Sequence, residues 1–179
     1  DIPLSEEILD QVVRGYRTIR NTFRFQIGNL FDFDRTTDAV PLEQLSPIDL
    51  WALDNTADLI EDVSKAFDAY EFHQGIQLVN RYCSNVLSAV YHDVLKDRLY
   101  TLSPNDPLRR SSQTTLDHIF RVLVKLLSPV MPCTTDEAWA YLEEGSDFCP
   151  EPLALQAWPK VDSAWRGVAK VEDVRSILA

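Results

Sequence analysis

Four long stretches of this sequence repeat apolar residues at intervals of three and four positions, which is the period of an amphipathic α-helix. These stretches cover residues 5–31, 46–67, 71–99 and 108–130. The segments between them lack the alternating pattern of β-strands, so we expect an all-α fold, an antiparallel helical bundle. With 179 residues, the chain is long enough to bury the core of one domain.

The first stretch carries two different faces. Its apolar positions are predicted to face the core, and they are Ile8, Val12, Tyr16, Ile19, Phe23, Ile27 and Leu30. Its polar positions Arg14, Arg17, Asn21 and Arg24 fall together on another flank at 100° per residue. Ser5 is placed to cap this helix, with two glutamates following at its positive end.

The other stretches give similar expectations. Ser46 is predicted to cap the second helix, with Pro47 at its first position. The third helix should turn Cys83, Val86, Val90 and Val94 inward. The fourth should bury Leu116, Phe120, Leu123 and Leu127. The bundle is expected over residues 1–145.

Residues 146–179 are expected to form a strap across the bundle and the start of a further, truncated helix. Before them, a short helix is predicted over 136–142, capped by Thr134 or Thr135. The segment at 152–159, PLALQAWP, alternates enough for a short extended strand or strap. The end of the chain from Val171 reads as the truncated helix.

The formal net charge of −11 argues against binding to nucleic acid, because contacts to phosphate need clustered lysine and arginine. The charge is, however, segregated along the chain. Residues 12–25 contain four arginines and no acid, whereas residues 46–71 contain seven acids and one lysine. A basic surface on an acidic molecule is therefore possible.

The sequence offers little for catalysis or metal binding. It has no phosphate-binding GxxxxGK[ST] loop, GxSxG turn or HExxH pair. Its three cysteines form no CxxC pair, and His73, His92 and His118 are far apart and are predicted to be helix-surface or interface residues. No apolar run approaches the roughly 18 residues of a membrane span, and no signal peptide is visible, so we expect a cytoplasmic protein.

The arginine-rich flank has two interpretations of about equal weight. Regularly spaced guanidinium groups can bind successive RNA phosphates, or they can pair with acids of neighbouring helices or of a partner domain. Three tryptophans near the C-terminal end, Trp139, Trp158 and Trp165, are predicted to be packing anchors rather than platforms for RNA bases.

Four separated segments resemble the anticodon-binding domain of isoleucyl-tRNA synthetases. They are RTIRNTFRFQIGNLFDFD at 17–34, the segment from AYEFHQ to KDRLY at 69–100, LRRSSQTTL at 108–116 and SPVMPCTTDEAW at 128–139. Their order matches the family along most of the chain. Valyl-type chains usually carry WN where this chain has Arg20 and Asn21, so the isoleucyl family is preferred over valyl and leucyl relatives.

The resemblance implies a domain that docks the anticodon stem and loop of isoleucine tRNA and sits beside the catalytic domain of the same parent chain, in a monomer. The family's HIGH and KMSKS signatures and its paired zinc cysteines are absent. This chain is therefore expected to have no catalytic residues, cofactor or metal of its own, with ATP and zinc bound elsewhere in the parent enzyme.

The segregated charge and the resemblance together predict RNA contact by the face of the first and fourth helices. The residues predicted to contact RNA are Arg17, Asn21, Arg24, Lys96, Arg98, Arg109 and Arg110. The alternative is a helical module that docks onto a protein or onto another domain.

Overall fold

The structure is a computed structural model that describes residues 5–143 and 151–167, without the side chains of 142 and 143. The helices of these segments are α1 (Glu6–Asn29), α2 (Pro47–Asp68), α3 (Phe72–Arg81), a π-helix (Tyr82–Tyr91), α4 (His92–Thr101), α5 (Pro107–Leu127) and α6 (Pro132–Glu143), with short 3₁₀ turns at Leu42–Gln44, Leu153–Leu155 and Ser163–Trp165. No strand occurs in the described segments. The predicted all-α fold is confirmed.

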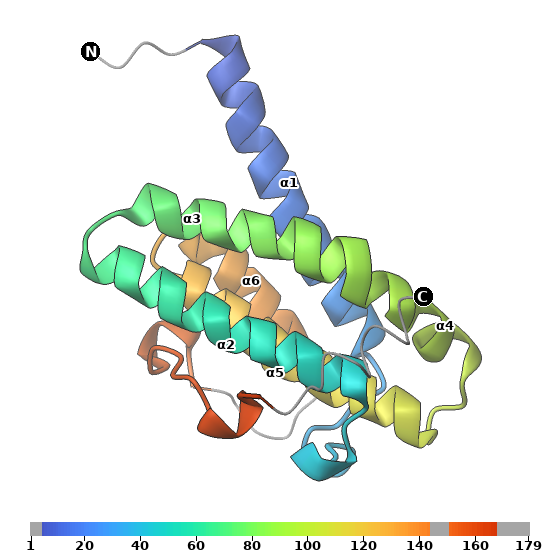
Figure 1. The fold of residues 1–179 in the computed structure, drawn as a ribbon. Helices are drawn as coiled ribbons and strands as arrows, with labels where there is room; N and C mark the ends of the chain where they lie inside the picture. The colour runs from blue at the N-terminus through green and yellow to red at the C-terminus, as the bar shows by residue number, and fades with distance from the viewer. Residues whose placement is uncertain (1–4, 144–150, 168–179) are drawn as a thin grey trace.

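Helix α2 and the continuous helical run from α3 to α4 lie antiparallel, and α5 packs against α2 beneath them (Figure 1). The turn between α2 and α3 places Tyr70 in the left-handed region at φ 60°. Just beyond it, a Cβ on Gly75 would lie 2.3 Å from the Phe67 ring, so glycine is required for this close crossing. Helix α1 crosses the bundle and contacts the π-helix, α5 and α6.

Helix α5 is the centre of the core. The four residues predicted to be buried on it, Leu116, Phe120, Leu123 and Leu127, are fully enclosed. Phe120 meets Phe23 of α1 in a T-shaped contact with ring centroids 5.7 Å apart, a favourable aromatic geometry. The helical period therefore identified the core face of α5 correctly.

The buried face of the third predicted helix changes register within the π-helix. Cys83 is buried as predicted, but Val86, Val90 and Val94 are only partly buried. The fully enclosed residues that follow are Leu87, Tyr91 and Leu95, spaced by four. A π-helix closes its hydrogen bonds at i→i+5 and has a wider turn, so the inward face moves by one residue relative to the expected pattern.

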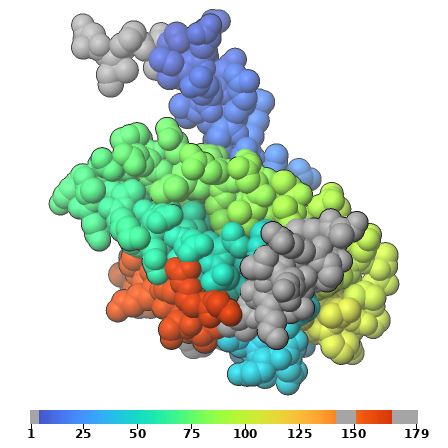
Figure 2. All heavy atoms as spheres, viewed as in Figure 1, coloured from blue at the N-terminus to red at the C-terminus, as the bar shows by residue number. Residues whose placement is uncertain are grey.

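The first half of α1 extends away from the bundle as an arm (Figures 1 and 2). Its predicted cap is confirmed, since the Ser5 hydroxyl accepts a hydrogen bond from the Ile8 amide at 3.3 Å. The prediction that Ile8, Val12 and Tyr16 face the core is wrong, because these residues are exposed in the structure. The bundle covers only the later part of the same face, at Ile19 and Phe23.

The segment after α5 differs from the expected pattern in two ways. Helix α6 begins at Pro132, earlier than predicted, so neither threonine caps it, and Thr135 instead donates to the carbonyl of Met131 at 3.0 Å. The PLALQAWP segment, called the strap below, forms a 3₁₀ turn and no strand. Trp158 of this strap donates to Ser64 of α2 at 2.9 Å. The helix predicted from Val171 lies outside the described residues.

A completely buried carboxylate, Asp49 near the start of α2, joins the helices at one end of the bundle. It accepts hydrogen bonds from Tyr91 (2.6 Å) and from Ser46 (2.7 Å) and Ser111 (2.6 Å). Arg98 lies 3.5 Å from the same carboxylate. Ser46 is the N-cap residue of α2, as predicted, but its hydroxyl donates to Asp49 and makes no side-chain cap hydrogen bond to the helix. Burial and the neighbouring carboxylate raise the pKa of Tyr91 well above its usual range.

Replacing this carboxylate should strongly destabilise the fold. In Asp49→Ala, the Arg98 cation and three hydroxyl groups lose their acceptor, and removing one partner of a buried ion pair typically costs about 3–5 kcal/mol. Urea unfolding followed by circular dichroism measures this loss. Asp93→Ala, which removes an exposed pair with Lys96, should stay within about 0.5 kcal/mol of the wild type. Equal stability of the two variants would contradict the stabilising role of Asp49.

His92 makes the stability of the fold depend on pH. It is buried and stacked on Phe25 with ring centroids 4.1 Å apart, and burial lowers its pKa to about 3. The ordinary pKa of histidine is about 6.5, so as the pH falls below this value His92 takes up a proton in the unfolded chain before it does so in the folded one. The free energy of unfolding therefore decreases from about pH 6.5 down toward about pH 3. Thermal melts should show a smaller loss between about pH 7 and pH 5 for His92→Gln, which cannot titrate, than for the wild type. Parallel losses in both proteins would show that His92 is not responsible.

Candidate nucleic-acid interface

Three of the residues predicted to contact RNA lie together on an exposed flank of α1. Arg17, Asn21 and Arg24, called the arginine stripe below, are all exposed. Arg17 and Arg24 lie seven residues apart, two helical turns along the same flank. Within the described parts of the chain, none of the three makes a side-chain hydrogen bond or ion pair. Their polar groups are thus available to an external partner.

The two other arginines of this helix are engaged locally. Arg14 donates to the carbonyl of Asp10, and Arg20 donates to the Tyr16 hydroxyl at 3.3 Å. Tyr16 also lies 3.5 Å from the Thr134 hydroxyl of α6, and these two hydrogen bonds lower the Tyr16 pKa. This contact ties the base of the arm to the bundle.

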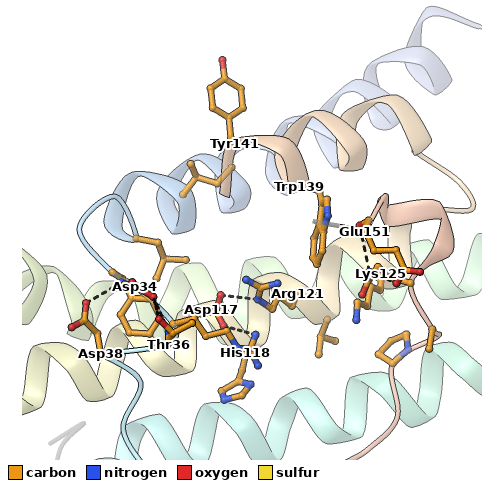
Figure 3. Close-up of a pocket in the computed structure, with 18 of the residues that line it drawn as sticks. Asp34, Thr36, Asp38, Asp117, His118, Arg121, Lys125, Trp139, Tyr141 and Glu151 are labelled. Atoms are coloured by element: carbon orange, nitrogen blue, oxygen red, sulfur yellow. Dashed lines mark hydrogen bonds and ion pairs between the residues drawn. The ribbon is translucent and has the colours of Figure 1, made fainter. Parts of the chain in front are cut away.

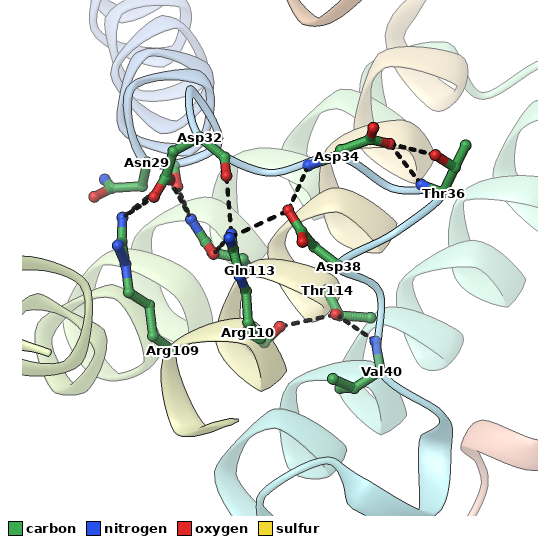
Figure 4. Close-up of polar contacts among 10 residues, drawn as sticks. All are labelled: Asn29, Asp32, Asp34, Thr36, Asp38, Val40, Arg109, Arg110, Gln113 and Thr114. Atoms are coloured by element: carbon green, nitrogen blue, oxygen red, sulfur yellow. Dashed lines mark hydrogen bonds and ion pairs between the residues drawn. The ribbon is translucent and has the colours of Figure 1, made fainter. Parts of the chain in front are cut away.

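Arg109 and Arg110 lie at the start of α5 and bind the loop that follows α1. Arg109, with only 7% of its side chain exposed, pairs with Asp32 at 2.9 Å. Arg110 donates to the Asp32 carbonyl at 2.9 Å and pairs with Asp38 at 3.3 Å (Figure 4). The structure therefore places both guanidinium groups in internal contacts, and RNA contact by them stays a prediction.

Gln113 and Thr114, one turn further along α5, complete the attachment of this loop. The Gln113 amide donates to the Asp32 carboxylate at 2.8 Å and to the Asn29 carbonyl at 2.9 Å. The Thr114 hydroxyl accepts from the Val40 amide at 3.1 Å (Figure 4). The RRSSQT segment thus holds residues 30–41, which we call the anchored loop.

The two candidate residues of α4 differ in their exposure. Arg98 turns inward, where it donates to Ser46 at 2.8 Å and pairs with Asp49. Lys96 is exposed but pairs with Asp93 at 2.9 Å, and this pair raises the Lys96 pKa. The predicted RNA residues therefore form one exposed group on α1 and a set of internally paired arginines, Arg98, Arg109 and Arg110. Lys96 belongs to neither group, because it is exposed but paired with Asp93.

A groove of about 1450 Å³ lies between the anchored loop, α5, α6 and the strap (Figure 3). Its floor contains Asp117, which is buried and binds both Arg35 and Arg121 at 2.8 Å. Arg121 also lies over the Trp139 ring, 5.1 Å from its centroid, within range of a cation–π contact. The groove thus combines aromatic walls with paired charges.

Two titratable groups of the groove have shifted pKa values. Burial lowers the Lys125 pKa, and the nearby cations Arg121 and Arg35 add to this effect. Burial also lowers the pKa of His118, which lies against Trp165 with ring centroids 5.6 Å apart. Trp139 and Trp165 are buried, as predicted for packing anchors, and Trp158 is partly buried.

The three histidines lie on different helices, His73 on α3, His92 on α4 and His118 on α5. His73 is exposed, whereas His92 is buried in the core, so the prediction of a surface or interface position is wrong for His92. Among the described residues, no three His, Cys, Asp or Glu side chains are grouped to hold a metal ion. None of the helices in these segments is both long and apolar enough to cross a membrane.

The sequence model of the family described as the anticodon-binding domain of tRNA ligase matches residues 49–179. The chain belongs to this family. The match begins at α2, and similarity to individual relatives extends it over α1 as well. Those relatives are isoleucine–tRNA ligases, so the resemblance to isoleucyl-tRNA synthetases seen in the sequence is confirmed.

The similar proteins include isoleucine–tRNA ligases from several bacteria. The chain is 42% identical to that of Moorella thermoacetica over 183 aligned residues, 97% of this chain and 20% of the relative. It is 40% identical to that of an Azoarcus species and 39% identical to that of Thermotoga maritima, each over the whole chain and 19% of the relative. The chain thus spans about a fifth of the length of these relatives.

One feature of this anticodon-binding domain was not predicted from the sequence, namely the attachment of the anchored loop to α5. Asp32 and Asp38 carried no prediction from the sequence, and Arg109 and Arg110 were predicted to contact RNA. More than 70 residues separate the partners, as in Arg109–Asp32. The available signal was the presence of three acids in one loop and two adjacent arginines elsewhere.

Removing the charge of Asp32 should loosen the anchored loop. In Asp32→Asn, the nearly buried Arg109 loses its carboxylate, so backbone amides at 33–40 should exchange with solvent at least about tenfold faster in hydrogen–deuterium exchange. Exchange in α3, which makes no contact with Asp32, serves as the internal reference. Unchanged exchange in the loop would show that this ion pair does not hold it.

Proposed function

We propose that this chain docks the anticodon stem and loop of isoleucine tRNA through the arginine stripe of α1. The observation that carries this proposal is the exposure of Arg17 and Arg24 without an internal partner in the described structure. Other arginines, such as Arg98 and Arg109, are paired with carboxylates. Two exposed guanidinium groups at two-turn spacing can bind phosphate oxygens along an RNA backbone.

The remaining candidates take secondary parts in this proposal. Asn21 lies between the two arginines, where its amide can donate to a phosphate or a ribose hydroxyl. Lys96 adds positive charge from α4. Arg98, Arg109 and Arg110 contribute mainly by holding the helices and the anchored loop in place, because their guanidinium groups already bind internal acceptors.

The names of the relatives support the choice of tRNA. Those proteins are isoleucine–tRNA ligases, and this chain corresponds to about a fifth of each. We propose that it serves as the RNA-docking part of a monomeric enzyme of that type. Ligation of isoleucine, with its ATP and zinc sites, then belongs to other parts of the parent protein.

A second candidate function is docking onto another domain, and it rests on the exposed apolar face of the arm. Ile8, Leu9, Val12 and Val13 are exposed on the same half of α1, and Val12 is 65% exposed. Apolar surface of this kind is typical of protein contacts. The catalytic domain of the parent enzyme is the partner that this face fits, and the two functions can coexist because Ile8 and Val12 lie on a different flank from the arginine stripe.

Replacing both arginines of the stripe should weaken binding to tRNA. Arg17→Ala combined with Arg24→Ala removes two phosphate contacts, so the slope of log affinity against log salt concentration should fall by roughly two. Filter binding of isoleucine tRNA over a salt series measures both the affinity and the slope. Val12→Ser, on the apolar flank of the same arm, is the matched control and should leave both unchanged.

Two results would contradict this proposal. Unchanged affinity and slope in the double variant would exclude the stripe as the RNA contact. If the wild type binds no tRNA even at low salt, the docking function of α1 is favoured. Loss of contact between this chain and the catalytic domain in Val12→Ser would then support that function.

A further inference from the structure

Phe31, in the anchored loop, is 81% exposed although its neighbours in the loop are held firmly. Leu30 before it is buried, and Asp32 after it binds Arg109 and Gln113 of α5. The backbone on both sides of Phe31 is therefore fixed by the core and by charge-assisted hydrogen bonds. A fixed backbone that exposes a large aromatic ring loses little conformational entropy on binding a partner, so it is preorganised for contact.

The loop also has internal hydrogen bonds that limit its motion. Asp34 accepts from the amide and hydroxyl of Thr36 at 2.8 and 2.7 Å, and the Asp34 amide donates to Asp38 at 2.9 Å (Figure 4). Because Asp38 in turn binds Arg110 at 3.3 Å, the turn of the loop is connected to α5. The exposed ring thus stands on a loop attached at several points.

The position of Phe31 connects it to the arginine stripe. It follows Arg24, the last residue of the stripe, by seven residues along the chain. Helix α1 ends at Asn29, so Phe31 lies just beyond the end of the stripe and on the rim of the groove between the loop and α5. An RNA whose phosphates follow the stripe toward this end would bring its next nucleotides to the ring.

We infer that Phe31 is a stacking platform for an unpaired nucleobase of the bound RNA, and that Arg109, Arg110 and Gln113 are positioning residues that hold it there. The inference rests on the proposed function of the stripe and adds a contact that distinguishes unpaired from paired RNA. Aromatic rings bind bases by stacking, whereas bases within a duplex are stacked on each other and inaccessible. One ring flanked by charged residues is too small an area for a stable protein interface, which favours a base as the occupant.

The test compares two RNAs with four single-residue variants of the 179-residue chain and one double variant. The RNAs are the anticodon stem-loop of isoleucine tRNA and a blunt duplex with the same stem sequence. Phe31→Ala should lower affinity for the stem-loop roughly tenfold and leave duplex affinity unchanged, because stacking needs an unpaired base. Phe31→Trp should retain stem-loop affinity. Tyr70→Ala removes an equally exposed aromatic at the opposite end of α2 and should affect neither RNA.

The fourth variant tests the positioning residues through Asp32, their shared acceptor. Asp32→Asn should weaken stem-loop binding more than duplex binding, and combining it with Phe31→Ala should add little further loss. Such non-additivity indicates that Asp32 acts through Phe31. Additive losses, or equal losses for both RNAs, would show a general structural effect and overturn the positioning role.

The results also separate this inference from the proposed function. If Phe31→Ala leaves stem-loop affinity unchanged while the Arg17 and Arg24 double variant loses affinity, the stacking role is overturned and the proposed function stands. If Phe31→Ala weakens both RNAs equally, the ring does not select unpaired bases, and the inference again fails. If the wild type binds neither RNA, both proposals fail.

Discussion

The buried carboxylate of Asp49 is the interaction on which the arrangement of the helices most depends. It lies near the start of α2 and receives hydrogen bonds from the π-helix and α5, with Arg98 of α4 close by. A charge in the core must be matched by donors with good geometry, and the observed placement of these helices brings Tyr91, Ser111 and Arg98 to the same carboxylate. This network thereby fixes the end of the bundle from which α5 and the anchored loop begin.

The use of arginine inside the bundle explains how an acidic chain can present a basic surface. Arg98, Arg109 and Arg110 are paired with carboxylates, so they neutralise acids without contributing to the exterior. The exposed stripe of α1 lies in a segment without acids, and within the described residues Arg17 and Arg24 pair with no carboxylate. The distribution of charge, rather than its total of −11, therefore determines where a phosphate backbone can approach.

The helical period predicted most of the fold, and it failed where the geometry departs from an α-helix. On α5 the predicted core residues are all buried, because regular helical geometry continues over the whole segment. In the π-helix the wider turn moves the inward face from Val90 to Tyr91, and this shift brings the Tyr91 hydroxyl to Asp49. Sequence periodicity assumes a constant turn, so it cannot show such a change. On α1 the period was correct, but it could not show that the bundle leaves Val12 uncovered.

The sequence by itself determined the all-α class, the family and the segregation of charge, because all three are encoded in local patterns of residues. It also identified the exposed flank of Arg17 and Arg24, since one helix defines that flank. Tertiary structure decided which arginines remain exposed, because ion pairs such as Arg109–Asp32 join residues far apart in the chain. Only the packed structure shows that Phe31 stands exposed on an anchored loop, since exposure depends on which neighbours cover a side chain and not on the residues beside it in sequence.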